Sequence, residues 1–469
     1  MSTADVATIE VRHPYDGSLV AEVPLATPAE VEHAVAAAHA VRHHAAALPA
    51  HVRADALAHV SARLTERADE VARLITSESG KPLTWARLEV ARAAATFRWA
   101  GEEARRWSGD LQRLDTDVVG AGRLAVVRRF PRGPVLGVAP FNFPLNLVAH
   151  KVAPAIAVGA PIVVKPAPRT PLSALLLAEI LAETALAEGM VAVLVVADAQ
   201  APALVADPRL PVVSFTGSGP VGHAIREAVP HKHVTLELGG NAAAVVCADW
   251  SSEADLDLAA TRIATFANYQ AGQSCIAVQR VLADRPVYDG LVPRLVKAVG
   301  ELRVGDPGDE ATEVGPLIDE AAARRVEEWV DEAVAAGATV LAGGVRDGCT
   351  YAPTVLADVP PDARVARDEV FGPVLVVSAF DGLDDGLAKV NDSRFGLQAG
   401  VFTHDVQVAF RAHRELEVGG VVIGDVPSYR ADQMPYGGAK ESGVGREGVR
   451  YAMEDFTYER VLVLTGLDL

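Results

Sequence analysis

Between residues 135 and 247, short apolar runs alternate with segments that have helical periodicity. The apolar runs have the length of buried strands and are Val135 to Val138, Ile162 to Lys165, Val191 to Val196, Val212 to Phe215, Val234 to Leu238 and Ala242 to Cys247. The helical segments are Leu147 to Val158, Pro171 to Glu188 and Val221 to Val229. This alternation predicts right-handed crossovers and a doubly wound parallel sheet. Ligands bind such sheets at the carboxyl ends of the strands, where Lys165 and Thr216 to Ser218 are expected.

The rest of the chain is predicted to form further helices, a hairpin and a second α/β block. Helices are expected at Glu30 to Ala47, Arg53 to Ser79, Thr84 to Trp107, Glu320 to Ala336 and Leu383 to Asn391. A hairpin is expected over Val118 to Arg129, around its glycine-rich turn, and a final strand over Thr457 to Leu464. The second α/β block runs from near Ala259 to about Lys440. With 469 residues, two or three domains are expected.

The composition indicates a globular protein with an acidic surface. The net charge is −18, so we expect no binding to nucleic acid or to an anionic membrane, either of which needs a basic face. The most apolar stretch, Pro134 to Pro166, is interrupted by prolines and polar residues, so we expect no membrane segment. An anionic substrate would need arginines placed close to it.

The three cysteines, Cys247, Cys275 and Cys349, fit neither a disulfide framework nor a zinc site. Their number is odd, and no C-x-x-C spacing occurs. The N-terminus lacks the charged-then-apolar pattern of a secretion signal. We therefore expect a reducing, cytoplasmic setting and no metal.

Cys275 is the cysteine whose surroundings suggest chemistry. It follows the turn Gln270 to Ser274, in which Gly272 lets the backbone approach a ligand, and it precedes an apolar run. If Cys275 caps an element so that backbone N–H groups point at its sulfur, the thiolate is stabilised and the cysteine is reactive. The alternative is a buried, unreactive cysteine.

A glycine motif, Gly217 to Gly222, satisfies the dinucleotide-binding pattern G-x-G-x-x-G between a predicted strand and a predicted helix. Glu237 follows Gly217 by 20 positions, where that pattern expects an acidic residue for the ribose. We reject this interpretation of Glu237, because the double-glycine turn Leu238 to Asn241 follows it and belongs to a different set of motifs.

That set resembles the aldehyde dehydrogenase superfamily from about His13 to the last strand. Its members are Pro140 to Pro144, Val164 to Pro166, Glu237 to Asn241, Gln273 to Cys275, Glu369 to Pro373 and Pro435 to Gly443. The resemblance implies an α/β fold with three parts. A Rossmann-like cofactor-binding domain would comprise residues 1–112 and 132–239, and an α/β catalytic domain residues 240–440. A small β oligomerisation arm would comprise residues 113–131 and 441–469, and would form homodimers or homotetramers.

The resemblance also implies catalytic roles. Cys275 would be the nucleophile that adds to an aldehyde, giving a thiohemiacetal and then a thioester. Asn142 would provide its side-chain amide to the oxyanion, a contribution of about 3 kcal/mol in comparable sites. Glu237 would activate the hydrolytic water, and Lys151 matches a family lysine near the active site.

For the cofactor, the resemblance implies NAD or NADP. Lys165 would bond the adenine-side ribose, Glu369 would hold the nicotinamide ribose, and Phe371 would pack beside it. The predicted cofactor contacts also include four residues near the glycine motif and the base, namely Gly217, Ser218, Gly222 and Leu238.

One position departs from the pattern of NAD-preferring members. Pro168 stands where many of them have a glutamate that accepts both ribose hydroxyls. Proline does not repel a 2′-phosphate, and the neighbouring Arg169 could attract one. We therefore expect NADP to be tolerated, and an NADP rate about a thousandfold below the NAD rate would refute this.

The substrate positions favour a small polar or anionic aldehyde. Ser274 and the loop Pro427 to Met434 match the family's substrate funnel, and they look most like the branch acting on lactaldehyde, semialdehydes and phosphonoacetaldehyde. Arg430, or Arg105 and Arg106, could pair with a substrate anion. The alternative for these arginines is pairing with surface carboxylates.

Two other functions stay open at this point. A CoA-acylating semialdehyde dehydrogenase would transfer the thioester to CoA, and Glu237 argues against it because CoA transfer needs no water-activating base. A cofactor-binding structural protein without turnover is disfavoured by the presence of Cys275, Asn142 and Glu237 together. A metal enzyme is disfavoured because His and Cys do not occur at ligand spacing.

Overall fold

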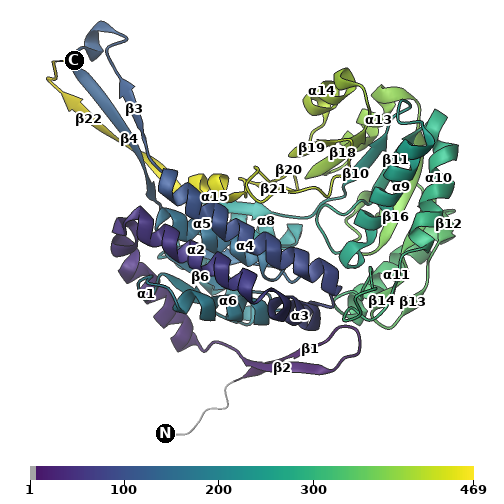
Figure 1. Cartoon of the computed structure of the whole chain (residues 1–469), viewed down its shortest axis with the longest axis horizontal. Coiled ribbons are helices and arrows are strands. Elements are labelled where there is room, and N and C mark those ends of the chain that lie inside the picture. Colours follow the sequence, from purple (N-terminus) through teal and green to yellow (C-terminus); the bar gives the residue numbers. More distant parts are fainter. Residues whose placement is uncertain (1–6, 469) are drawn as a thin grey trace.

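A computed structural model describes residues 7–468 and contains two large twisted sheets and a smaller one (Figure 1). The first large sheet has the order β21-β9-β8-β5-β6-β7. Its strands are β5 (Val135–Val138), β6 (Ile162–Lys165), β7 (Val191–Val193), β8 (Val212–Thr216), β9 (His233–Glu237) and β21 (Gly443–Val444). All neighbours are parallel except β21 and β9. The predicted doubly wound parallel sheet is therefore confirmed.

Helices cover both faces of this sheet because its central strands are buried and apolar on both sides. One face packs against α2 (Ala50–Glu66), α3 (Ala68–Ser79), α4 (Leu83–Arg106), α5 (Asn146–Val158) and α6 (Leu172–Ala182). The other face packs against α1 (Pro28–Ala47), α7 (Ala201–Ala206) and α8 (Gly219–Ala228). The helix expected over Arg53 to Ser79 is two helices, which meet at Arg67. The short pair β1 (Thr8–Arg12) and β2 (Leu19–Pro24) lies at the edge.

The second large sheet has the order β12-β15-β16-β11-β10-β18-β19. Its strands are β10 (Ala243–Val246), β11 (Arg280–Asp284), β12 (Thr339–Ala342), β15 (Thr354–Ala357), β16 (Val374–Phe380), β18 (Gln398–Phe402) and β19 (Gly420–Ile423). The run Ala242 to Cys247, expected in the first sheet, forms β10 of the second. Its neighbours are β11 and β18, so the second block begins at β10 rather than near Ala259.

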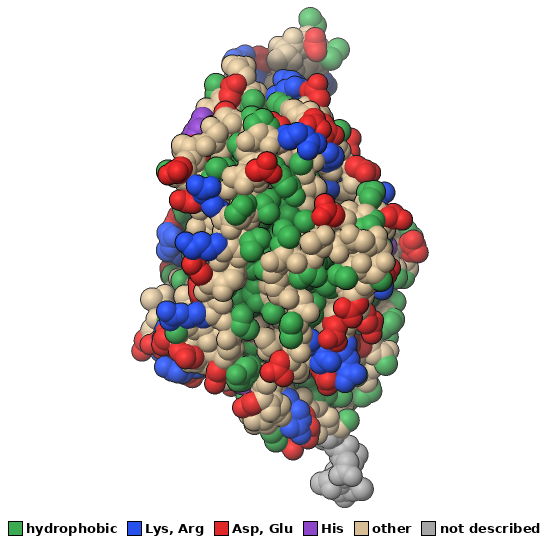
Figure 2. All heavy atoms as spheres, turned by 90° about the vertical axis from the view of Figure 1, so that its right-hand side faces the viewer, with side chains coloured by type: hydrophobic (Ala, Val, Ile, Leu, Met, Phe, Trp, Pro, Cys, Tyr) green, Lys and Arg blue, Asp and Glu red, His purple; other side chains and the backbone are tan. Residues whose placement is uncertain are grey.

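The second sheet is also covered on both faces. On one face lie α9 (Glu253–Asn268) and α10 (Arg285–Gly300). On the other lie α11 (Glu320–Ala335), α13 (Gly382–Asn391) and α14 (Val406–Glu415). On the face shown in Figure 2, acidic and basic side chains are interspersed around a central strip of hydrophobic ones. The negative net charge is thus not gathered into one block on this face.

The third sheet projects from the body as an arm (Figure 1) and has the order β22-β4-β3. Its strands are β3 (Asp110–Arg113), β4 (Arg123–Pro131) and β22 (Thr457–Thr465). The predicted final strand is confirmed. The predicted hairpin is displaced, because residues 118–120 form the 3₁₀ turn η1 and β4 pairs with β3 across it.

Part of the predicted arm belongs to the first sheet. Strand β21 pairs with β9, and α15 (Val449–Asp455) packs on α4 and α5. Small elements complete the chain, namely β13 (Arg346–Asp347), β14 (Thr350–Tyr351), β17 (Phe395–Gly396), β20 (Ala439–Lys440), α12 (Arg364–Arg367), and the 3₁₀ turns η2 (Asp198–Gln200) and η3 (Tyr269–Gly272). Within residues 7–468, no helix is long and apolar enough to cross a membrane.

Candidate active site

A cavity of about 390 Å³ lies at the carboxyl ends of β8 and β9, where segments of the second sheet's half meet the first sheet. It brings together residues that are far apart in the sequence. The lining of the cavity includes Arg92, Phe141, Asn142, Gly217, Ser218, Glu237, Leu238, Tyr269, Ser274, Cys275, Glu369, Phe371, Ser428, Arg430 and Tyr436. Most of the predicted catalytic, cofactor and substrate residues therefore line one space.

A left-handed turn directs Cys275 into this cavity. Gln270 and Ala271 have φ of 51° and 53°, and Gly272 has φ of 69°. A Cβ at Gly272 would lie 2.1 Å from the carbonyl oxygen of Gly372, so only glycine fits there. Two non-glycine residues in this region indicate strain that the surrounding contacts maintain at the site.

The environment of the Cys275 thiol differs from the expected one. No element begins at Cys275, and β11 starts only at Arg280, so no capped backbone stabilises the sulfur. Burial raises the pKa of the Cys275 thiol to about 12, and the nearby carboxylate of Glu369 adds to the effect. The sulfur instead forms a hydrogen bond with a side chain, 2.9 Å from Sγ to the hydroxyl of Tyr436.

Asn142 is held beside the turn that carries Cys275. Its Nδ2 donates to the Gln273 carbonyl at 3.0 Å, and its own backbone carbonyl accepts from the Gln270 side chain. The amide nitrogen carries a second hydrogen, which the Gln273 bond does not use. This geometry leaves one side-chain donor for an oxyanion formed next to Cys275.

Glu237 ends β9 and reaches the cavity as a buried carboxyl group. Neither of its oxygens has a hydrogen-bond partner among the described residues. Burial raises its pKa well above the ordinary value, and the negative charge of Glu447 adds to this. Burial and a like charge both favour the neutral form of a carboxyl group, so Glu237 holds its proton more tightly than an exposed glutamate does.

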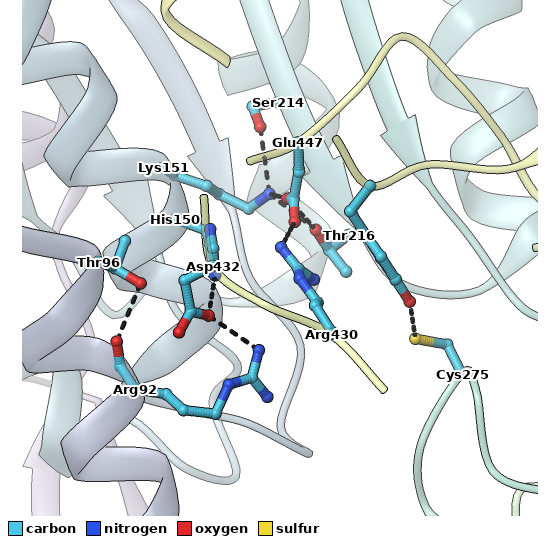
Figure 3. Close-up of polar contacts among 11 residues, drawn as sticks. Arg92, Thr96, His150, Lys151, Ser214, Thr216, Cys275, Arg430, Asp432 and Glu447 are labelled. Carbon is cyan, nitrogen blue, oxygen red and sulfur yellow. Dashed lines mark hydrogen bonds and ion pairs between the residues drawn. The ribbon is translucent and has the colours of Figure 1, made fainter. Parts of the chain in front are cut away.

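Behind the cavity, Lys151 and Arg430 share the carboxylate of Glu447 (Figure 3). Lys151 Nζ lies 3.1 Å from Glu447 Oε1 and donates to the hydroxyls of Ser214 and Thr216 at 3.1 and 2.7 Å. Arg430 donates to Glu447 Oε2 at 3.1 Å. Although burial opposes it, these two cations hold the pKa of Glu447 well below its usual range. Lys151 does not line the cavity, and its contacts are with Glu447 and with two residues of β8.

Two arginines line the cavity on the side of α4 and the loop 427–434. Arg92, on α4, donates to Asp432 at 2.9 Å, and Asp432 also bonds His150 at 3.0 Å. The guanidinium of Arg430 lies 3.9 Å above the ring of Tyr436. Both arginines keep a buried Nε–H without a partner within residues 7–468. Each therefore has hydrogen-bonding capacity left.

The predicted cofactor residues at the carboxyl end of β8 form a shape that fits a dinucleotide. Ser218 begins helix α8, whose N-terminal N–H groups have no side-chain cap, and a Cβ at Gly219 would meet nothing within 4 Å. Open space at a helix N-terminus favours a phosphate. A Cβ at Gly217 would meet the Phe215 ring at 2.6 Å, and one at Gly222 would meet Leu238 at 2.4 Å, so packing requires glycine at both positions. Gly217 also lines the cavity, whereas Gly222 does not.

Glu369, another predicted cofactor contact in the cavity lining, is a buried carboxyl group. It accepts one hydrogen bond, from the Gly240 N–H at 3.0 Å. Burial raises its pKa to about 7. Its second oxygen lies close to Gly239, where a Cβ would be only 2.3 Å away. Phe371 packs edge-on against Phe141, with ring centroids 5.9 Å apart. A carboxylate with a free acceptor suits a ribose hydroxyl.

Four of the residues expected to contact the cofactor lie outside the cavity lining, namely Lys165, Pro168, Arg169 and Gly222. Lys165 forms an ion pair with Asp198 at 2.8 Å. Pro168 is partly exposed beside it in the sequence. Arg169 forms an ion pair with Asp319 at 2.7 Å, so its guanidinium is not free to bind a 2′-phosphate.

The predicted substrate contact of Arg106 is not supported. Its side chain is 63% exposed at the end of α4, where it pairs with Glu103, and it is not among the cavity residues. Arg105 pairs with Asp55 at 2.5 Å. Arg105 and Arg106 therefore pair with surface carboxylates, as the alternative interpretation expected.

Sequence reasoning missed several residues of the site. Tyr436 stands in the motif Pro435 to Gly443, but the sequence gives no sign of a role for its hydroxyl. Glu447 lies shortly after the same motif, and nothing in its local sequence indicates a role in the site. Arg92 shows only the periodicity of α4, and its partner Asp432 is 340 residues away.

Comparisons with known proteins agree with this geometry. The sequence matches the model of the "Aldehyde dehydrogenase family" over residues 1–462. It is 42% identical to 3-sulfolactaldehyde dehydrogenase of Priestia aryabhattai over 457 residues, covering 97% of this chain and 94% of the relative.

Two solved structures are similar along nearly the whole chain. The crystal structure of aldehyde dehydrogenase 21 from Physcomitrella patens, in complex with the reaction product succinate, has a TM-score of 0.96 and 43% identity, covering 100% of this chain and 97% of that one. Glyceraldehyde-3-phosphate dehydrogenase GapN from Methanocaldococcus jannaschii, complexed with NADP, has a TM-score of 0.92 and 34% identity, covering 97% and 99%.

Proposed function

Because this chain belongs to the aldehyde dehydrogenase family, we propose that it oxidises a small aldehyde with an anionic group to the carboxylic acid. NAD or NADP is the oxidant. The observation that carries the anionic substrate is the placement of Arg92 and Arg430 on one side of the cavity that holds Cys275. Both have unused guanidinium donors.

The relatives support this substrate class by what their names state. One acts on sulfolactaldehyde, and a structural neighbour holds the product succinate. Both compounds carry an anionic group at the end remote from the reacting carbon. Guanidinium groups bind carboxylates and sulfonates through charge-assisted hydrogen bonds. In a strongly acidic protein, two cavity arginines give an anion its local counter-charge.

Three side chains carry out the chemical steps. The Cys275 thiolate adds to the carbonyl carbon, and the free N–H of the Asn142 amide stabilises the resulting oxyanion. When bound, NAD or NADP supplies the acceptor for the hydride that leaves the thiohemiacetal carbon. Glu237 then takes a proton from the water that attacks the thioester on Cys275. Lys151, Glu447 and Arg430 fix the charges around this base.

The residues that would hold the cofactor are Gly217 and Ser218 with the N-terminus of α8, Leu238, Glu369 and Phe371. Lys165 and Pro168 would lie beyond the cavity, on the adenosine side. Pro168 offers no acceptor for the ribose hydroxyls, so we keep the proposal that both NAD and NADP are used.

We also propose the three-part organisation with its arm, a homodimer or homotetramer joined through the arm, and a cytoplasmic location. The exposed apolar side chains of β22 support the oligomer. The free state of Cys247, Cys275 and Cys349 supports a reducing compartment.

The substrate proposal is tested with two four-carbon aldehydes, succinate semialdehyde and neutral butanal. Arg92→Met and Arg430→Met should each lower kcat/KM for succinate semialdehyde by about 30- to 100-fold, the value of about 2–3 kcal/mol for a charge-assisted contact. Butanal oxidation by Arg92→Met should change by less than about threefold, whereas Arg430→Met also removes a partner of Glu447 and should slow both aldehydes, with the larger loss for succinate semialdehyde. Arg106→Met is the matched control, because this arginine lies outside the cavity.

Equal losses for both aldehydes would refute the anion site. A wild-type enzyme that releases acyl-CoA rather than acid when CoA is present would replace the hydrolytic reaction by the CoA-acylating alternative.

A further inference from the structure

The hydroxyl of Tyr436 is the hydrogen-bond partner of the Cys275 sulfur, and the catalytic steps above leave this contact unused. The two atoms are 2.9 Å apart, and no other partner of this sulfur occurs within residues 7–468. In Figure 3 this bond is the dashed line that ends at the Cys275 sulfur.

The position of Tyr436 is fixed from its backbone outward. Its N–H donates to the Glu447 carbonyl at 2.9 Å, and the Glu447 N–H donates back to the Tyr436 carbonyl at 2.6 Å. Its side chain packs with Ile276 and Leu397, and only 3% of the residue is exposed. The phenol therefore cannot turn away from Cys275 without unpacking this cluster.

The contact discriminates between the two protonation states of the sulfur. A thiol can donate or accept a weak hydrogen bond, whereas a thiolate can only accept one. When Cys275 loses its proton to water in the cavity, the phenol becomes the donor in a bond to a charged acceptor, which is stronger than the bond to the thiol. The contact thus favours the thiolate.

The surroundings keep the phenol in its donor form. Burial raises the pKa of Tyr436 well above its ordinary value. The Arg430 guanidinium, 3.9 Å from the ring centroid, further polarises the hydroxyl as a donor.

We propose that Tyr436 is a catalytic residue whose phenolic O–H donates a hydrogen bond to the Cys275 thiolate and so increases the fraction of active nucleophile. This inference rests on the proposed role of Cys275. It assigns to a tyrosine the stabilisation that backbone N–H groups were expected to provide.

Other charged and titratable groups face the sulfur and stay in place in the test. Glu369 and Glu237 disfavour the thiolate, Arg430 favours it, and the hydroxyl of Tyr269 lies close by. Tyr436→Phe keeps the ring and its packing and removes one oxygen. Tyr269→Phe is the matched control, because that buried hydroxyl bonds Ser274 at 2.5 Å rather than the sulfur.

The test measures the rate at which iodoacetamide alkylates Cys275 between pH 7 and 9, with Cys275→Ala identifying the signal. Below the thiol pKa this rate is proportional to the thiolate fraction. Tyr436→Phe should lower it about 10- to 100-fold at every pH and keep a slope of one in log rate against pH, the effect of losing a bond to a charged group. Tyr269→Phe should leave it within about threefold. Aldehyde oxidation by Tyr436→Phe should fall by a similar factor in kcat.

An unchanged alkylation rate in Tyr436→Phe would overturn the inference, as would an equal loss in Tyr269→Phe. Undiminished aldehyde oxidation by Cys275→Ala is a different result, since it would overturn the proposed nucleophile itself. If Tyr436 only packed against its neighbours, Tyr436→Phe would change thermal stability but leave the alkylation rate of Cys275 at each pH unchanged.

Discussion

Burial sets the protonation of the two carboxyl groups nearest the nucleophile. Among residues 7–468, no group donates a hydrogen bond to Glu237, and Glu369 accepts one from the Gly240 N–H. Burial raises the pKa of Glu369 to about 7 and that of Glu237 well above its ordinary value. A raised pKa makes a carboxylate a stronger base than an exposed glutamate, which is the direction that general-base catalysis needs. This direction of the pKa shift supports the proposed role of Glu237 as the base.

For Glu237→Gln, we expect a rapid burst of about one reduced nicotinamide per subunit, followed by turnover at least 100-fold slower than wild type. The amide preserves the size of the side chain but cannot accept a proton from water, so acylation proceeds and hydrolysis stalls. Stopped-flow absorbance measures both phases. Loss of the burst together with turnover would contradict a role confined to hydrolysis.

In the wild type, the hydrolytic rate should rise with pH, because burial raises the pKa of Glu237 and this carboxyl group must lose its proton before it can act as a base. Steady-state rates at saturating substrate from pH 6 to 9 measure this. The residual turnover of Glu237→Gln should lack the rise, and a parallel rise in both proteins would assign it to another group.

Two buried glutamates join the N-terminal helices to the helices beside the sheet. Glu78, at the end of α3, accepts from the N–H groups of Leu172 and Ser173 at 2.6 and 3.1 Å, where α6 begins. Glu89, on α4, accepts from Leu145 and Asn146 at 3.0 Å, where α5 begins, and pairs with buried Lys81. Carboxylates at helix N-termini satisfy free N–H groups and complement the dipole. Through α5, Glu89 also supports the segment that carries Asn142.

Glu78 should make stability depend on pH. Burial raises its pKa to about 7, from 4.5 when the chain is unfolded. Between these values the folded protein binds more protons than the unfolded chain, so this contribution is complete below pH 4.5 and lost as pH rises to about 7. Its size is about 3 kcal/mol. Glu78→Gln, which cannot ionise, should gain thermal stability relative to wild type from pH 4.5 to 8, and a pH-independent difference in Tm would contradict this.

The sequence predicts the strands of the first sheet well and the site only in part. Strands β5 and β6 lie at the predicted residues, because a strand buried on both faces is a continuous apolar run. The turn before Cys275 could not be foreseen, since nothing local shows that Gln270 and Ala271 take positive φ. Contacts such as Arg92 with Asp432 join distant segments and depend on how the two sheets meet. The sheet to which β10 belongs likewise depends on pairing rather than on its own residues.

The shape of the whole molecule supports the proposed oligomer. The arm stands away from the body (Figure 1), and four consecutive residues of β22, from Val461 to Leu464, are 39–58% exposed. Because successive strand residues face opposite sides, both faces of this strand are uncovered. Exposed apolar strands of this kind pair with or pack against another chain.

Leu462→Asp should therefore reduce the oligomer to the 49.2 kDa chain. Sedimentation velocity measures the mass. Val345→Asp, at an exposed valine far from the arm, is the control that should leave the mass unchanged. A wild type that already sediments as one chain would refute the proposed oligomer.

The central claim, that Cys275 carries the oxidation of an anionic aldehyde, is tested most directly by reduced-nicotinamide absorbance with succinate semialdehyde and either NAD or NADP. Wild type and the matched Cys247→Ala variant should both turn over, because Cys247 is buried in the core beneath β10. Cys275→Ala should lose all measurable activity while still binding cofactor. Turnover that persists in Cys275→Ala, or a wild type that binds cofactor and oxidises no aldehyde, would contradict the account.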